Sequence, residues 1–346
     1  MSSKNKKLLI GLVIIIVIMT VSWLISYQQR RKIFSGAPSG CLRENETVSY
    51  EIKRKENAVS TADIIVINKN NNKEKYRFQI ELPLSDHYHP IEIHRCGVYA
   101  VRSFNYDYNI HTSLPGYKTE LWKYDYKGNG EKIILLAEDI LGNLKGYKYF
   151  FSSDFRVDSQ EKYIVLIKNY PQKEDYSLVI KDLATKEDVF VLLAKSISQQ
   201  YPNIVGVFDM LKWTNDSRYF WGSISDGAYV NGYFRIDTQN WKVDIFEAPE
   251  GAMGGSDLNV NTGYLTIQPG QVWTGFSEIE EELKEEYRKE GKKSSLYIYN
   301  LFSKEKILID ETDEPLWWFE AEWLSDNELQ YKMPNGEKKI YRLNNI

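Results

Sequence analysis

The chain has 346 residues, of which 42% are apolar and 14% aromatic, enough for one large repeat domain or two ordinary domains with a core that needs no disulfides. Its formal net charge is −4, but residues 1–32 carry six of the 44 Lys and Arg and no acid, which leaves 38 basic against 48 acidic residues, a net of −10, on the remainder. An acidic domain repels phosphate backbones, which argues against nucleic acid as a partner.

The N-terminal segment predicts a membrane anchor. Residues 8–26 form an uncharged run of 19, about the length that crosses a bilayer as a helix, and basic residues flank it on both sides. Ser35-Gly36-Ala37 fits a signal-peptide cleavage site but lies well beyond the apolar run, so cleavage is the alternative. We expect a short cytoplasmic tail at residues 1–7, an uncleaved transmembrane helix, and a C-terminal domain held outside the cytoplasm at the cell membrane.

A polar linker is expected at residues 27–46, followed by one domain over residues 47–346. Cys41 and Cys96 are the two cysteines of the chain. They can form one disulfide if the domain lies outside the cytoplasm, although two cysteines make no disulfide framework.

A hairpin pattern recurs five times along the domain. Each copy has an apolar strand, a polar turn that opens on Asp or Asn, and a second apolar strand. The short side chain of Asp or Asn can accept a hydrogen bond from the backbone two residues on and so start the reversal. The turns open 57, 57, 55 and 63 residues apart, at Asn68, Asp125, Asp182, Asp237 and Asn300.

A second pattern precedes the hairpins. Its clearest copy is Trp213-Thr-Asn-Asp216-Ser-Arg-Tyr219; Trp323–Leu329 and the segment from Phe155 to Tyr163 are further copies. An inner strand pair followed by an outer hairpin makes a four-stranded sheet, and radial stacking of such sheets gives a β-propeller. The residues resemble the W-[ST]-x-D-G/S element of TolB-like and WD-like bacterial propellers, with Asn327 as a departure from it. The resemblance covers roughly residues 45–346 and also extends to the propeller half of dipeptidyl peptidase IV-like enzymes.

The fold class is therefore all-β. We expect a six-bladed propeller, or alternatively a five-bladed one in which Ile64–Ile80 joins the Trp323 pair, with the two ends of the chain meeting to close the ring. Residues 277–291 predict a helical insertion in the fifth unit, because Gly291 suits a C-terminal cap and Ile279, Leu283 and Tyr287 form an apolar stripe. The helix is either a decorated loop on the domain edge or a partner-docking element.

Motifs for catalysis are mostly missing from the sequence. There is no G-x-S-x-G nucleophile elbow and no histidine after His111, which argues against a propeller peptidase with its own hydrolase domain. His87, His89 and His94 lie in one window, and such a set can hold a divalent metal. The alternative is an ordinary polar loop that enters the second blade. We expect no cofactor, with a divalent metal at these histidines as the alternative.

Aromatic residues supply the other candidate site. Trp317, Trp318 and Phe319 can form a binding shelf, although such residues also pack between blades. Tyr287 on the helix is a further candidate binding residue. We expect a membrane-anchored, non-catalytic module that binds a protein or an envelope component. The alternative is a propeller enzyme, a hydrolase or lyase on glycans, with its site in the central channel or at the histidines.

Overall fold

The computed structural model describes residues 41–53, 60–82, 91–107, 112–139, 150–170, 175–226, 229–253, 256–270 and 277–343. The predicted cytoplasmic tail, the transmembrane helix and most of the linker lie outside the described residues. Within the described residues no helix is both long and apolar enough to cross a membrane.

The described strands form six separate antiparallel sheets, three of four strands and three of three. The first holds β1 (Glu46–Lys53), β2 (Ser60–Asn68) and β3 (Lys73–Leu82), and the second holds β4 (Ile91–His94), β5 (Gly97–Asp107), β6 (Thr112–Tyr124) and β7 (Gly130–Asp139). The third holds β8 (Phe150–Val157), β9 (Tyr163–Tyr170), β10 (Asp175–Asp182) and β11 (Asp188–Leu193). The fourth holds β12 (Val207–Trp213), β13 (Tyr219–Ser225), β14 (Val230–Asp237) and β15 (Lys242–Glu247). The fifth holds β16 (Tyr264–Ile267), β17 (Ser294–Asn300) and β18 (Lys306–Thr312), and the sixth holds β19 (Glu322–Trp323), β20 (Glu328–Lys332) and β21 (Lys338–Arg342).

The predicted hairpins are confirmed, and so is the reason for them. In all five, the Asp or Asn that opens the turn accepts a hydrogen bond from the backbone N–H two residues on. The five N···Oδ distances lie between 2.8 and 2.9 Å, from Asn70 to Asn68, Lys127 to Asp125, Ala184 to Asp182, Gln239 to Asp237, and Phe302 to Asn300.

The inner turns share a second backbone form. After Trp213, the Thr214 Oγ1 accepts a hydrogen bond from the Tyr219 N–H at 2.9 Å, and Ser217 adopts the left-handed conformation with φ 59°. The third sheet repeats this turn, because the Asp158 N–H donates to the Tyr163 carbonyl and Glu161 has φ 55°. The repeated pattern in the sequence therefore marks a tight turn between the first two strands of a sheet.

Apolar clusters lie between successive sheets. Strand β10 shows the arrangement, because Leu178 and Ile180 pack toward the fourth sheet while Val179 packs toward the second. A strand that is apolar on both faces is buried on both faces. Three further clusters join the first sheet to the second, the fourth to the fifth, and the fifth to the sixth. The sheets therefore stack face to face like the blades of a propeller, with an apolar cluster between each successive pair.

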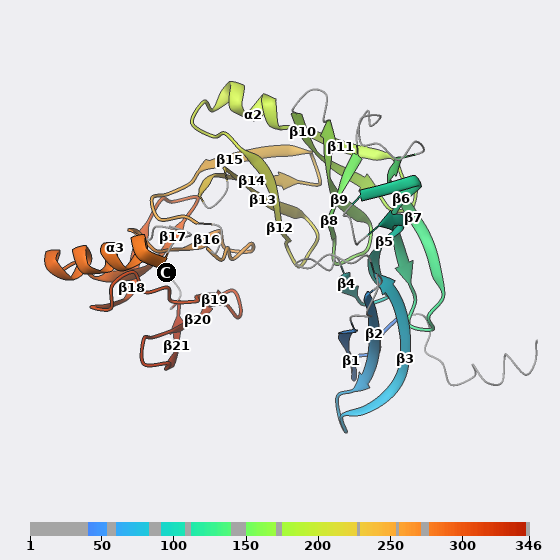
Figure 1. Cartoon of the computed structure of the whole chain (residues 1–346), viewed down its shortest axis with the longest axis horizontal. Coiled ribbons are helices and arrows are strands. Elements are labelled where there is room, and N and C mark those ends of the chain that lie inside the picture. Colours follow the sequence, from blue (N-terminus) through green and yellow to red (C-terminus); the bar gives the residue numbers. More distant parts are fainter. Residues whose placement is uncertain are drawn as a thin grey trace, which may run out of the picture.

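The two ends of this stack lie apart. Figure 1 shows the sheets following one another along an arc, with the β1–β3 sheet at one end and the β19–β21 sheet at the other. The expectation that the ends meet, and the pairing of Ile64–Ile80 with the Trp323 strands, are corrected by this arrangement, because β2 and β3 pair with β1 in a sheet of their own.

The end sheets explain why the arc stays open. Each has one apolar face turned toward its neighbour and an opposite face that is mainly polar, although Ile65 and Ile67 lie on that face in the first sheet and Ile340 in the last. On the first sheet the polar face carries Asp63, which accepts hydrogen bonds from Lys53 at 2.6 Å and Arg77 at 3.1 Å. On the last sheet it carries the ion pair between Glu328 and Arg342, 2.9 Å apart. Polar outer faces are what terminal units of a linear repeat array require.

The predicted helical insertion is confirmed as α3 (Ser277–Glu290), which lies between β16 and β17. Gly291 ends it with φ 63°, and the N–H groups of Gly291 and Lys292 donate to the carbonyls of Arg288 and Tyr287 in the Schellman pattern. A second helix, α2 (Ala194–Gln200), connects the third and fourth sheets.

Candidate functional site on the loop face

The arc has two faces of different character. The tight turns at 69–72, 94–97, 125–129, 158–162, 182–187, 214–218, 237–241, 259–263, 300–305 and 324–328 lie at one end of the strands, which we call the turn face. Outer turns contact inner turns there, because the N–H of Leu183 donates to the Lys162 carbonyl and the N–H of Thr238 donates to the Arg218 carbonyl. The longer connections, including α2 and α3, leave the opposite ends of the strands, which we call the loop face.

Hydrogen bonds join the turn face from one sheet to the next. The Ser159 Oγ donates to the Asn215 carbonyl at 2.8 Å, and the Asn261 Nδ2 donates to the Asp326 Oδ1 at 2.7 Å. The Trp221 indole donates to the Val260 carbonyl at 2.9 Å. These contacts fix successive sheets relative to one another, so the turn face is a rigid platform.

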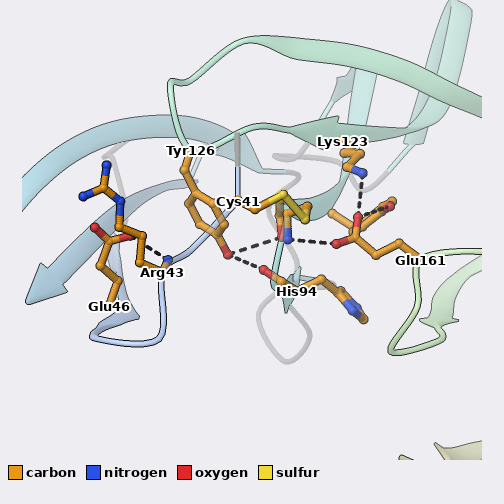
Figure 2. The surroundings of a disulfide bond; sticks show 10 residues. Cys41, Arg43, Glu46, His94, Lys123, Tyr126 and Glu161 are labelled. Atoms are coloured by element: carbon orange, nitrogen blue, oxygen red, sulfur yellow. Dashed lines mark hydrogen bonds and ion pairs between the residues drawn. A yellow bond between two sulfur atoms is a disulfide. The ribbon is translucent and has the colours of Figure 1, made fainter. Parts of the chain in front are cut away.

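Glu161 is a largely buried charge of this platform, with a side chain that is 10% exposed. Its carboxylate accepts hydrogen bonds from the Cys96 N–H at 2.8 Å, the Tyr99 hydroxyl at 3.0 Å and the Lys123 ammonium at 2.5 Å (Figure 2). Burial raises the pKa of Glu161, but the hydrogen bonds from Lys123 and Cys96 lower it by more, so the pKa lies below its ordinary value. Glu161 is therefore an ionised link between the second and third sheets.

Cys41 and Cys96 form a disulfide beside this link. The bond ties the segment that precedes β1 to the turn between β4 and β5, and the Leu42 N–H adds a hydrogen bond to the Arg95 carbonyl at 2.7 Å. Figure 2 shows the two sulfur atoms between Tyr126 and Glu161. The chain thus enters the first sheet from a point fixed on the turn face.

His94 is the described member of the predicted metal site. It is the last residue of β4, its Nε2 lies 3.2 Å from the Glu92 Oε2, and its ring meets the edge of Tyr99. His87 and His89 lie outside the described residues. Among the residues that the structure describes, no three His, Cys, Asp or Glu side chains are grouped to hold a metal ion. The metal site at His87, His89 and His94 stays a prediction.

The other candidate residues meet at the loop-face end of β16. The side chain of Gln268, just after β16, accepts a hydrogen bond from the Phe319 N–H at 3.0 Å. The backbone N–H of Gln268 donates to the Gly251 carbonyl at 3.2 Å. Two residues on, the Gly270 carbonyl accepts a hydrogen bond from the Tyr287 hydroxyl at 2.8 Å. Residues 268–270 thus hold α3, the 249–253 connection and the 313–321 connection together.

The aromatic segment next to Gln268 divides into buried and accessible parts. Phe319 is fully buried, and the Trp317 indole is held by a hydrogen bond to the Lys332 carbonyl at 2.9 Å within the cluster between the last two sheets. Trp318 between them is partly exposed. Of the predicted shelf, Phe319 is buried, Trp317 is held by the Lys332 carbonyl, and Trp318 is partly exposed, as Trp317 also is.

The backbone around Trp318 is strained. Leu316 and Glu320 both adopt positive φ, 53° and 45°, and the left-handed conformation costs a non-glycine residue on the order of 1–2 kcal/mol. Hydrogen bonds to the ends of the segment hold it in place, including one from the Trp317 N–H to the Ser294 Oγ at 2.9 Å. The fold therefore maintains an unfavourable backbone that fixes the position of Trp318.

Gln268 could not be foreseen from the sequence. A single glutamine after a short apolar strand has no pattern that distinguishes it from a solvated residue. Its role follows from being 2% exposed and from its contacts to segments about 17 and 51 residues away.

No family model and no curated protein matches this chain. Among solved structures, it is similar to the β-propeller domain of the trilobed protease from Pyrococcus furiosus, with 11% identity, a TM-score of 0.45, and coverage of 88% of this chain and 81% of that one. It is similar to TolB from Acinetobacter baumannii, with 10% identity, a TM-score of 0.34, and coverage of 87% and 80%. It is also similar to the acylaminoacyl peptidase of Pyrococcus horikoshii, with 10% identity, a TM-score of 0.44, and coverage of 88% and 44%. At these identities the matches concern the fold and say nothing of activity.

Proposed function

We propose that the chain is a membrane-anchored, extracytoplasmic binding protein whose open arc of six blades presents its loop face to a protein or envelope component. The observation that carries this proposal is the difference between the two faces. Short turns cross-linked by hydrogen bonds fix the turn face, while the long connections, α3 and Trp318 gather on the loop face. Binding residues on loops held by a rigid scaffold are the common arrangement in recognition proteins.

The disulfide supports the proposed compartment. Cys41 and Cys96 are paired, and disulfides persist in oxidising environments outside the cytoplasm. The uncharged run at residues 8–26, with basic residues on both sides, is the proposed single transmembrane helix. Together they support a topology with the acidic domain outside and the short N-terminal tail inside.

The test compares two positions on the full chain in its native membrane. A photoreactive phenylalanine analogue replaces Trp318 on the loop face or, as the matched control, Phe302 on the turn face, where that aromatic ring is 47% exposed. We expect one specific adduct from position 318 and none from position 302. Adducts from position 302 alone, or the same adducts from both positions, would refute a loop-face binding site.

A further inference from the structure

Three apolar side chains lie exposed at the loop-face end of the fourth sheet. Val205, Val207 and Tyr229 are 49%, 40% and 45% exposed. Asn231 ties their segments together, because its Nδ2 donates to the Val205 carbonyl at 2.6 Å and its carbonyl accepts from the Ala248 N–H at 3.2 Å. We call Val205, Val207 and Tyr229 the apolar patch.

A glycine fixes the geometry of this patch. Gly206 has φ 134°, and a Cβ on it would lie 2.0 Å from the Ser225 carbonyl oxygen. Only glycine lets the chain pass this close to β13, where Val207 pairs with Ser225. The patch also borders the site at Gln268, because Tyr229 forms a β-bridge with Met253 in the connection that Gln268 holds through Gly251.

Four carboxylates lie on the segments that carry or contact the patch. Asp209, Asp226, Glu247 and Glu250 are all exposed, and within the described part of the chain none of them forms an ion pair. Asp226 lies in the turn to Tyr229, since its N–H donates to the Tyr229 carbonyl at 3.2 Å. The apolar surface is therefore bordered by uncompensated negative charge.

The sequence shows that this imbalance extends over whole segments. Residues 196–211, 219–234 and 243–270 contain six acidic residues and no Lys or Arg, in a chain that has 44 basic residues. Two of the six, Asp244 and Asp257, are neutralised from outside these segments by Arg235 and Lys212. The four that remain are the carboxylates around the patch.

We infer that the apolar patch and its four carboxylates are the docking site for a basic segment of a partner protein that also carries apolar side chains. This inference rests on the proposed function and names the chemistry of its partner. Charge complementarity selects the partner and speeds its association, while apolar contact supplies affinity. The same charges repel anionic lipid and a second copy of this acidic domain.

The test uses two fluorescent peptides of equal length and leucine content, one with lysine and one with glutamate at the polar positions. The full chain, in nanodiscs of phosphatidylcholine, is titrated with each peptide, and anisotropy is recorded at low and high salt. We expect only the lysine peptide to bind, with an affinity that falls at high salt. Two double variants, Asp226→Asn with Glu250→Gln and Val207→Ser with Tyr229→Ser, should each weaken that affinity about tenfold or more. Phe302→Ser with Glu187→Gln on the turn face is the matched control and leaves binding unchanged.

Circular dichroism and the melting temperature of each variant establish that it is folded. Equal binding of the two peptides, or lysine-peptide binding that the patch variants leave intact, would overturn the inference. So would patch-dependent binding to phosphatidylglycerol vesicles, or self-association that the patch variants abolish. If the peptide test fails but position 318 gives a specific adduct, the inferred partner chemistry is wrong and the proposed function is unaffected. If the lysine peptide binds at the patch but position 318 gives no adduct, the proposed site at Trp318 is wrong.

Discussion

The carboxylate of Glu161 accepts a hydrogen bond from the backbone N–H of Cys96, 65 residues earlier in the chain. The contact joins the turn that begins β9 to the turn that carries the disulfide. Because Glu161 is ionised and largely buried, a neutral glutamine in its place keeps one acceptor oxygen but turns an NH2 donor toward either the Cys96 N–H or the Lys123 ammonium, and it removes the charge that pairs with Lys123.

We therefore expect Glu161→Gln to lower the free energy of unfolding by about 1–3 kcal/mol, the usual effect of leaving a buried polar group unsatisfied. Chemical denaturation monitored by tryptophan fluorescence measures the change. Glu187→Gln, on an exposed turn of the same sheet, is the control and changes stability little. Equal stability of the Glu161 and Glu187 variants would show that the link between the sheets is not energetically important.

The polar outer face of the first sheet predicts an acid dependence. Hydrogen bonds from Lys53 and Gln79 outweigh the effect of burial and lower the pKa of Asp63 to about 2. Because the folded pKa lies below the unfolded value of about 3.9, Asp63 stabilises the fold fully above that value, and the contribution is lost as the pH falls toward 2. Asp63→Asn should flatten the decline in melting temperature between about pH 4 and pH 2.

Scanning calorimetry from pH 2 to 7 tests this dependence. Asp313→Asn, at a carboxylate that is 92% exposed, serves as the control. If the melting temperature falls as steeply with decreasing pH in the Asp63 variant as in the parent protein, Asp63 does not have this role.

The disulfide predicts a redox-dependent stability. Cys41 and Cys96 are 55 residues apart, and closing a loop of that length stabilises a protein by about 4 kcal/mol in the chain-entropy treatment. Reduction with dithiothreitol, or replacement of both cysteines by serine, should lower the melting temperature. The doubly substituted protein should then show no response to the reductant. An unchanged melting temperature after complete reduction, verified by thiol labelling, would refute the prediction.

The open arc predicts that damage at its end stays local. Deleting residues 338–346 removes β21, which covers part of the apolar cluster shared by the last two sheets. We expect faster amide exchange in β16–β20 and unchanged exchange in the first three sheets, measured by mass spectrometry. Ile340→Ser, on the polar outer face where Ile340 is 53% exposed, is the control and should change nothing. Faster exchange in β1–β3 after the deletion would indicate that the two ends meet in solution.

Much of this fold could be predicted from local chemistry. The five hairpin turns were predictable because a short side-chain acceptor at the first turn residue acts within its own turn. The turn after Trp213 was predictable for the same reason. The opening of the arc was not foreseen, although the alternation of Ser49, Glu51 and Lys53 with apolar residues along β1 shows that one face of this strand is polar.

The candidate site was predictable only in part. Trp318 and Tyr287 were predicted as candidate binding residues because aromatic side chains can form a binding surface, but nothing in their spacing places both beside residues 268–270. That convergence depends on the order of the sheets, which no local pattern encodes. The exposure of Val205 and Val207 likewise depends on where β12 begins, and an apolar run beside Phe208 predicts burial for all of them.

The separated ends of the arc have a consequence for how such a chain can change over time. In a closed propeller, the number of blades is fixed by the angle that each blade must fill, and the gain or loss of one blade forces every remaining blade to reorient. In this protein each apolar cluster joins only successive sheets, and the two outermost surfaces are already suited to water. Duplication or deletion of one 57-residue unit inside the array would leave both ends intact. The length of the recognition surface can therefore vary among descendants of such a gene without any geometric requirement to complete a circle.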